Sequence, residues 1–142
     1  MSDGAGIVLL IGRILFIALF LVSAFGHLTK SEMMVGYARS KNLPLAPLGG
    51  WPAGLYQLAA AVLIAIGIWP DIGAIMLGIY VTIAAFYFHD FWVIEDAMQR
   101  QLEQLNFFRN VTLLGTAIIL LAFFASIGDG VRYTIIAPLI RF

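Results

Sequence analysis

The sequence predicts an all-α integral membrane protein: four helices in an antiparallel up-and-down bundle, with both chain termini on the same side of the membrane. Hydrophobic residues make up 62% of the 142 positions and charged residues 11%, far below the ~25% charged that is typical of soluble domains. The apolar residues gather in four runs, and most charges lie at the ends of these runs. Each run approaches the ~20 residues that a helix needs to cross the hydrocarbon core. We therefore expect one membrane domain, residues 1–142, with spans at about 7–28, 51–69, 72–90 and 106–127.

The first run is either a spanning helix or a secretory signal. It is longer than the ~7 to 15 apolar residues of a signal, and Ser23-Ala24-Phe25 before Gly26 makes a poor cleavage site. We expect a spanning helix. The connection that follows, residues 29–50, mixes apolar and charged residues, which is typical of a short helix in the membrane interface. Two prolines near its end indicate an irregular return to the membrane.

Tryptophan and proline mark the middle of the chain. Trp51-Pro52 opens the second run and Trp69-Pro70 closes it, each pairing an interfacial aromatic residue with a helix boundary residue. The second break is so short that the second and third runs must form a tight antiparallel hairpin. The connection at 94–105 is polar and lacks helix breakers, so we expect the fourth helix to begin early and to protrude into water. The tail, residues 131–142, is expected on the surface.

Basic residues give the orientation of the spans. The first and third connections carry four of the eight, Lys30, Arg39, Lys41 and Arg100, with Arg109 close by. Because cytoplasmic loops are enriched in Lys and Arg, the count favours connections 29–50 and 94–105 in the cytoplasm.

Charge and composition exclude several kinds of partner and chemistry. The net charge is zero and no basic cluster exists, so nucleic acid is excluded as a partner, and the expected surroundings are the lipid bilayer. The chain has no cysteine, which excludes disulfides, iron–sulfur clusters and thiolate metal sites within it.

Polar side chains that lipid would reject gather at the membrane edge that faces the first and third connections. The candidates for a ligand site there are His27, Gln57, His89, Asp90, Arg109 and Asn110. Histidine can pass a proton near neutral pH, and amide or guanidinium groups can hold the carbonyl oxygens of a quinone-like or acidic headgroup. The alternative is structural, because such residues also hydrogen-bond between helices and to headgroup water.

Metal and haem binding are disfavoured at this edge. His89 and Asp90 are adjacent on a helix and point ~100° apart, so they do not readily chelate one ion. The bulky aliphatic surroundings leave no room for a haem between the two histidines. We predict no metal and no cofactor in the chain, with quinone as the candidate ligand.

The opposite membrane edge carries Arg13 and Asp71. An arginine one or two turns inside the membrane is costly unless it is paired or reaches the headgroups. Two alternatives follow: Arg13 forms an ion pair with Asp71 that staples the first helix to the third, or it snorkels alone to the headgroups.

Several segments, in order along the chain, resemble the DoxX family. They are Arg13-Ile14-Leu15-Phe16, the stretch from Phe20 to Leu28, Asn42-Leu43-Pro44, Phe88-His89-Asp90-Phe91-Trp92 and Phe108-Arg109-Asn110-Val111. The resemblance implies a compact four-helix protein of the bacterial inner membrane. It also implies a link to redox chemistry, since members include membrane subunits of quinone-dependent sulfur oxidation and proteins that act beside a partner oxidoreductase.

Two positions depart from the family pattern. Gln57 stands where the family commonly has Glu, and Arg109 where it often has Lys. Glutamine hydrogen-bonds but does not titrate, which argues against a proton-coupled role for position 57.

Two functional hypotheses follow. In the first, the protein is a non-catalytic accessory subunit of a membrane-bound redox or respiratory complex, with protein partners. In the second, it binds a quinone or another small molecule at the histidine edge and takes part in quinone-dependent oxidoreduction. A quinone site moves no electrons without a donor nearby, and the chain carries no redox cofactor signature, so the sequence favours the first.

Overall fold

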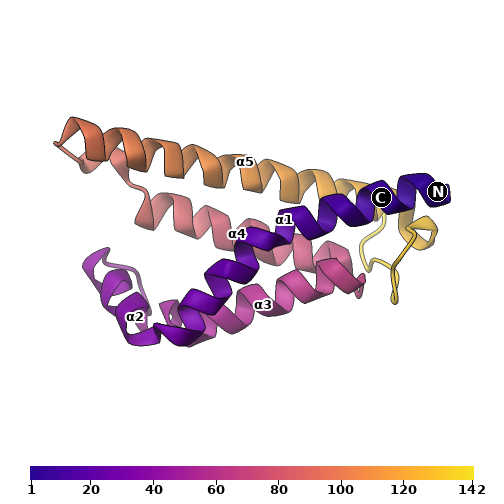
Figure 1. Cartoon of the computed structure of the whole chain (residues 1–142), viewed down its shortest axis with the longest axis horizontal. Coiled ribbons are helices and arrows are strands. Elements are labelled where there is room, and N and C mark those ends of the chain that lie inside the picture. The colour runs from indigo at the N-terminus through magenta and orange to yellow at the C-terminus, as the bar shows by residue number, and fades with distance from the viewer.

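All regular elements of the protein are helices. The computed structural model describes residues 1–142 and confirms the all-α class (Figure 1). The helices are α1 (Asp3–Thr29), α2 (Ser31–Ser40), α3 (Trp51–Ile66), α4 (Pro70–Phe88) and α5 (Ala97–Ile127), with three 3-10 turns, η1 (Ala46–Gly49), η2 (Phe91–Val93) and η3 (Gly128–Gly130). Three of the α-helices, α1, α4 and α5, are long and apolar enough to cross a membrane, and α3 is a shorter apolar helix of 16 residues.

Capping groups explain where the helices begin and end. The fourth long helix starts at Ala97, well before 106, because the Asp96 carboxylate caps it by accepting a hydrogen bond from the amide of Gln99 (2.8 Å). Helix α3 ends at Ile66, before the expected Trp69. The next residue, Gly67, has φ +70°, the left-handed conformation that terminates helices.

Helix α3 lies in the middle of the packing, against α1 on one side and α4 on the other, and α4 packs against α5. The close approach of α3 to α1 and of α4 to α3 depends on two glycines. A Cβ at Gly54 would lie 3.0 Å from the carbonyl oxygen of Ala24 in α1, and one at Gly73 would lie 2.8 Å from that of Ala60 in α3. Small residues at such crossings are a property of membrane helix packing.

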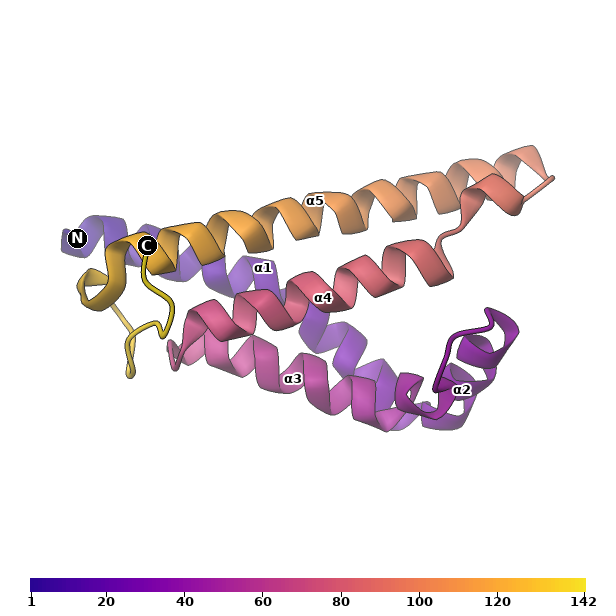
Figure 2. The ribbon, with the colours of Figure 1, turned by 180° about the vertical axis from the view of Figure 1, so that it is seen from behind.

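The core is continuous along the molecule. It is built from aromatic and aliphatic side chains that include Phe20, Ile64, Leu77 and Phe124, all nearly or fully buried. The long helices alternate in direction, and the two termini lie at the same end (Figures 1 and 2). Helix α2 and the α4–α5 turn lie at the other end.

The C-terminal segment, residues 131–142, does more than rest on the surface. It folds back over the α3–α4 turn, where the carbonyl oxygen of Gly67 accepts hydrogen bonds from the amides of Ile135 (2.8 Å) and Ile136 (3.0 Å). Val131 joins the core. We call residues 131–142 the C-terminal strap.

Arg13 and Asp71 are both fully buried, but they do not form the ion pair considered above, and Arg13 does not snorkel. The Arg13 guanidinium donates to the carbonyl oxygens of Ile64 (2.7 Å), Ala65 (2.8 Å) and Tyr133 (3.0 Å). The last carbonyls of a helix have no intrahelical donor, and a cation is favoured at that end. Arg13 therefore caps α3 and ties the strap to it.

Asp71 holds the far part of the strap. Its Oδ2 accepts hydrogen bonds from the amides of Leu139 (2.9 Å) and Ile140 (2.7 Å). These partners are backbone groups of the last residues of the chain. Arg13 and Asp71 therefore have separate roles at the same end of the molecule: Arg13 caps α3, and Asp71 anchors the strap.

Candidate ligand-binding site

A cavity of about 390 Å³ lies beneath the irregular part of the first connection. Four elements form it: the end of α1, the loop 43–49, the start of α3 and the second half of α4. Most of the lining is apolar, from Leu43, Pro44, Leu45, Leu48, Gly49, Pro52, Ala53, Ile79, Ile83, Ala84 and Phe88. Three polar residues also face it, His27, Tyr56 and Tyr80.

Backbone geometry fixes the loop over the cavity. Leu45 has φ +57° and precedes η1, and the amide of Leu48 donates to the Leu45 carbonyl (2.9 Å). The loop then joins α3 at Gly50, where a Cβ would collide with the Ser31 side chain. The Ser31 hydroxyl accepts from the amide of Trp51 (2.8 Å). The roof of the cavity is therefore held to the first turn of α2.

His27 is the polar centre of the cavity. Its Nδ1 lies 2.7 Å from the carbonyl oxygen of Gly49, and its Nε2 lies 3.2 Å from the Tyr80 hydroxyl. A carbonyl only accepts, so Nδ1 carries the proton, and in the neutral ring Nε2 accepts from Tyr80. Tyr80 meets the imidazole edge to face, with ring centres 6.3 Å apart. The tautomer and orientation of the imidazole are thereby both set.

Gln57 belongs to the same neighbourhood but lies deeper. It is fully buried, and its Nε2 donates to the carbonyl oxygen of Ala53 (3.2 Å). The side chains of Ser23 and Gln57 lie beside the Tyr80 hydroxyl. The other amide atom of Gln57, Oε1, is buried without a hydrogen-bond partner. Of the six predicted residues, the structure brings His27 and Gln57 together.

His89 and Asp90 form a second polar group, outside the cavity. His89 Nδ1 lies 2.7 Å from a carboxylate oxygen of Glu103 in α5, and Asp90 pairs with Lys41 just after α2. The hydrogen bond from Lys41 to Asp90 raises the pKa of the lysine. This group, His89, Glu103, Asp90 and Lys41, ties the ends of α2, α4 and α5 together, and Asp90 does not orient an imidazole.

The two α5 candidates stand apart from both groups. Arg109 is exposed and has no hydrogen-bonded or ionic partner, and Asn110 donates back to the carbonyl oxygen of Asn106 in its own helix (3.0 Å). Neither residue lines the cavity. Of the six candidates, therefore, only His27 lines the cavity, and Gln57 is buried beside Tyr80, the partner of His27. His89 and Asp90 bind other elements, and Arg109 and Asn110 lie apart on α5.

Sequence reasoning missed Tyr80 and Tyr56. A signal for Tyr80 exists, since a tyrosine in the middle of an aliphatic helix must place its hydroxyl on a partner when it is buried. Tyr56 donates to the carbonyl oxygen of Met76 (3.0 Å). The segment 94–105 was expected only to protrude into water, although Glu103 within it is the partner of His89. That pairing depends on the angle between α4 and α5.

The aromatic residues near the α4–α5 turn contact each other rather than the cavity. Phe86, Phe91, Trp92 and Phe107 meet in tilted or edge-to-face pairs with ring centres 5.3 to 6.4 Å apart. No group of three or more His, Cys, Asp or Glu side chains in the structure could hold a metal ion. The cavity at His27 and Tyr80 is therefore the place where a ligand meets both apolar surface and hydrogen-bonding groups.

Comparison with known proteins supports a membrane assignment. Residues 8–90 match the model of a family described as DoxX. The chain is 27% identical over 115 residues to "Inner membrane protein YphA" of Escherichia coli (strain K12), an alignment that covers 80% of this chain and 81% of that protein. No solved structure matches. The resemblance stated above and the expected location in the bacterial inner membrane are both confirmed.

Proposed function

Because the chain belongs to the DoxX family of integral membrane proteins, we propose that it is an inner-membrane protein that binds a membrane-soluble small molecule, of the quinone class, in the cavity at His27 and Tyr80. One observation carries the proposal. A mostly apolar cavity of about 390 Å³ contains a hydrogen-bonded histidine–tyrosine pair at its polar end. Ligand sites are typically apolar cavities of ~300 to 1,000 Å³ with a few placed polar groups.

The chemistry of the pair suits a ring oxygen in either oxidation state. The Tyr80 hydroxyl can donate to a ligand carbonyl, or it can accept from a ligand hydroxyl while it donates to His27 Nε2. The His27 ring is held in place by its Nδ1–H, which donates to the carbonyl oxygen of Gly49. A carbonyl and the hydroxyl that replaces it on reduction could therefore bind at the same place.

The chain supplies no electron donor of its own. Its residues bind and orient the ring, exclude water with the 43–49 loop, and hold a proton at His27. Electron transfer would come from a partner oxidoreductase, since a quinone site alone moves no electrons. We therefore propose a binding role for this chain and no enzymatic activity by itself.

The accessory-subunit hypothesis remains a second candidate, favoured by the start of α5. Here Met98, Leu102 and Leu105 are exposed at helical spacing beside polar neighbours, and α5 extends past the end of α4 (Figure 2). An apolar stripe outside the membrane suits a protein partner. A photocrosslinking residue at Leu102 should capture a discrete membrane partner in cells, whereas one at the lipid-facing Ile119 should not. Equal capture at both positions would remove this candidate.

We also propose that α1, α3, α4 and α5 all cross the membrane, with both termini on one side. Helix α3 is short, but Trp51 and Trp69 flank it and both are exposed, which suits the two interfaces. The alternating directions of the long helices support this topology (Figure 1). The basic residues favour the cavity end in the cytoplasm.

The binding role is tested by what the protein retains on purification in mild detergent. The wild type should carry near-stoichiometric quinone detectable by mass spectrometry, and Tyr80→Phe and His27→Leu should lose most of it. His89→Leu is the matched control, because His89 pairs with Glu103 outside the cavity. If Tyr80→Phe and His27→Leu carry as much quinone as the wild type, the binding site is not this cavity.

A further inference from the structure

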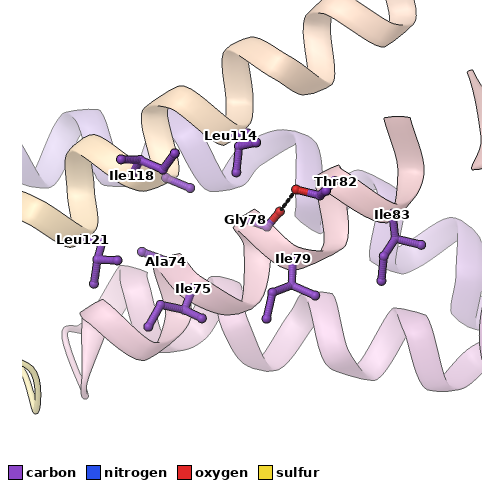
Figure 3. Close-up of a pocket in the computed structure, with 10 residues that line it drawn as sticks. Ala74, Ile75, Gly78, Ile79, Thr82, Ile83, Leu114, Ile118 and Leu121 are labelled. Atoms are coloured by element: carbon purple, nitrogen blue, oxygen red, sulfur yellow. Dashed lines mark hydrogen bonds between the residues drawn. The ribbon is translucent and has the colours of Figure 1, made fainter. Parts of the chain in front are cut away.

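A second hollow lies on α4 beside the cavity. It is a groove of about 330 Å³ between α4 and α5, where Leu114 and Ile118 face Ala74 and Gly78 (Figure 3). The groove is apolar almost throughout. The hydroxyl of Thr82, which also lines it, is occupied by a hydrogen bond to the carbonyl oxygen of Gly78 (2.8 Å). The groove therefore suits a hydrocarbon chain and offers nothing to a polar group.

Two residues join the groove to the cavity. Ile79 and Ile83 line both hollows and are 51% and 43% exposed. Figure 3 shows them on the side of α4 that points away from α5. The two hollows are thus separated by two aliphatic side chains on the surface of one helix, and an extended chain can cross between them without leaving apolar surface.

The two hollows follow one another along α4 in the same order as the polar head and the hydrocarbon tail of a membrane lipid. The cavity lies toward the end of α4, at Phe88, and the groove continues back to Ala74 near its start. From Ile83 to Ala74 the helix rises ~13 Å. The polar end of the cavity thus lies near one membrane edge, and the groove leads from it into the hydrocarbon region.

We propose that the ligand is a long-chain amphiphile whose ring occupies the cavity and whose isoprenoid or alkyl tail crosses Ile79 and Ile83 and lies in the α4–α5 groove. This inference rests on the proposed function, because it extends the same site. Gly78 keeps the groove open. A Cβ there would already lie 3.5 Å from Leu114 Cδ1 and 3.7 Å from the Ala117 methyl group, so a longer side chain must occupy the groove itself.

The test compares two probes with the same ring, 2,3-dimethoxy-5-methyl-1,4-benzoquinone without a tail and with a decyl chain. Dissociation constants are measured for the purified full-length protein at one detergent concentration. The wild type should bind the decyl probe about tenfold more tightly. Gly78→Leu should reduce the decyl affinity to the tail-free value and leave the tail-free affinity unchanged. Gly115→Leu is the matched control, because a Cβ at Gly115 meets nothing within 4 Å.

Each outcome decides between the two proposals. A decyl preference that survives Gly78→Leu would overturn the tail site, and so would a change of oligomeric state in this variant with no change in affinity. If Gly78→Leu does not fold, Ile118→Trp at the exposed edge of the groove replaces it, with the same expected loss. If the proposed function itself is wrong, Tyr80→Phe should leave the affinities for both the tail-free and the decyl probe unchanged.

Discussion

Arg13 shows how a buried charge is accommodated when no counter-ion contacts it. Its three hydrogen bonds all go to backbone carbonyls, two at the end of α3 and one in the C-terminal strap. The planar guanidinium has several donors in a fixed fork, which suits this arrangement better than a lysine ammonium would. The sequence indicated that Arg13 needs a partner. It could not indicate these partners, because carbonyl groups occur at every residue.

Replacement of Arg13 by methionine should destabilise the protein strongly. Methionine keeps an apolar stem but donates no hydrogen bond, so three carbonyls lose their donor. Each carbonyl that stays buried without a donor lowers the free energy of unfolding by about 1 to 3 kcal/mol. We expect the free energy of unfolding to fall by about 3 kcal/mol or more, which is measured as a lowered thermal midpoint in detergent. Arg109→Met is the control, since Arg109 is exposed and has no partner, and should shift stability by less than about 0.5 kcal/mol. Equal midpoints for the two variants would contradict the capping role.

The cavity residues were partly predictable from the sequence. His27 and Gln57 could be placed near each other because lipid rejects both and they lie toward the same membrane edge. Tyr80 could not be ranked above the other aromatic residues, since its role depends on the 3.2 Å approach to His27. The loop 43–49 carries no polar signal, and the residues that close the cavity are ordinary leucine and proline.

Among the elements, α2 and the ends of α4 and α5 are linked by the Lys41–Asp90 ion pair and by the hydrogen bond between His89 and Glu103. The existence of the long apolar helices was predictable from the apolar runs, but two of their ends differ from the prediction, because Gly67 terminates α3 before Trp69 and Asp96 caps a start of α5 well before residue 106. The strap was not predictable, because backbone amides and carbonyls hold most of it. A sequence does not reveal that Asp71 accepts from residues 139 and 140.

The Lys41–Asp90 pair should stabilise the protein in a pH-dependent way. The hydrogen bond to Asp90 raises the pKa of Lys41 above 10.5, so its contribution is complete below that pH and disappears as the pH rises through the folded-state pKa. Wild type should therefore exceed Lys41→Met in thermal midpoint at pH 8, and the difference should close as the pH rises through the raised pKa of Lys41. Lys30→Met, which removes an exposed lysine, should show no such closing difference. A gap between wild type and Lys41→Met that is constant up to pH 12 would count against the pair.

The whole molecule is polarised. One end holds the termini and the strap, and the other holds α2 and the α4–α5 turn (Figures 1 and 2). Arg13 and Asp71 lie at the first end, where they bind the strap. The second end holds the loop 43–49 with its cavity, the Lys41–Asp90 ion pair and the His89–Glu103 hydrogen bond. The sequence predicted polar groups at both ends. It did not predict that one end is closed by backbone hydrogen bonds while the other encloses a cavity.

Cysteine labelling can test the proposed topology, because the chain has no native cysteine. Single cysteines at Ser2 and Phe142 should react with an impermeant reagent from one side of the membrane. Cysteines at Ser40 and Gln101 should react only from the other side, the cytoplasmic side if the basic residues set the orientation. Labelling of Ser2 and Ser40 from the same side would rule out four crossings.

The cavity can be located by photolabelling. An azido-benzoquinone irradiated with the membrane-embedded protein should attach to peptides that contain the loop 43–49 or the α4 segment 79–88, and excess unlabelled quinone should prevent it. Tyr80→Phe should reduce the same labelling, while His89→Leu should not. Labels that fall instead on the lipid-facing surface of α1 or α5, or that excess quinone does not displace, would show that the cavity at His27 and Tyr80 is not the binding site.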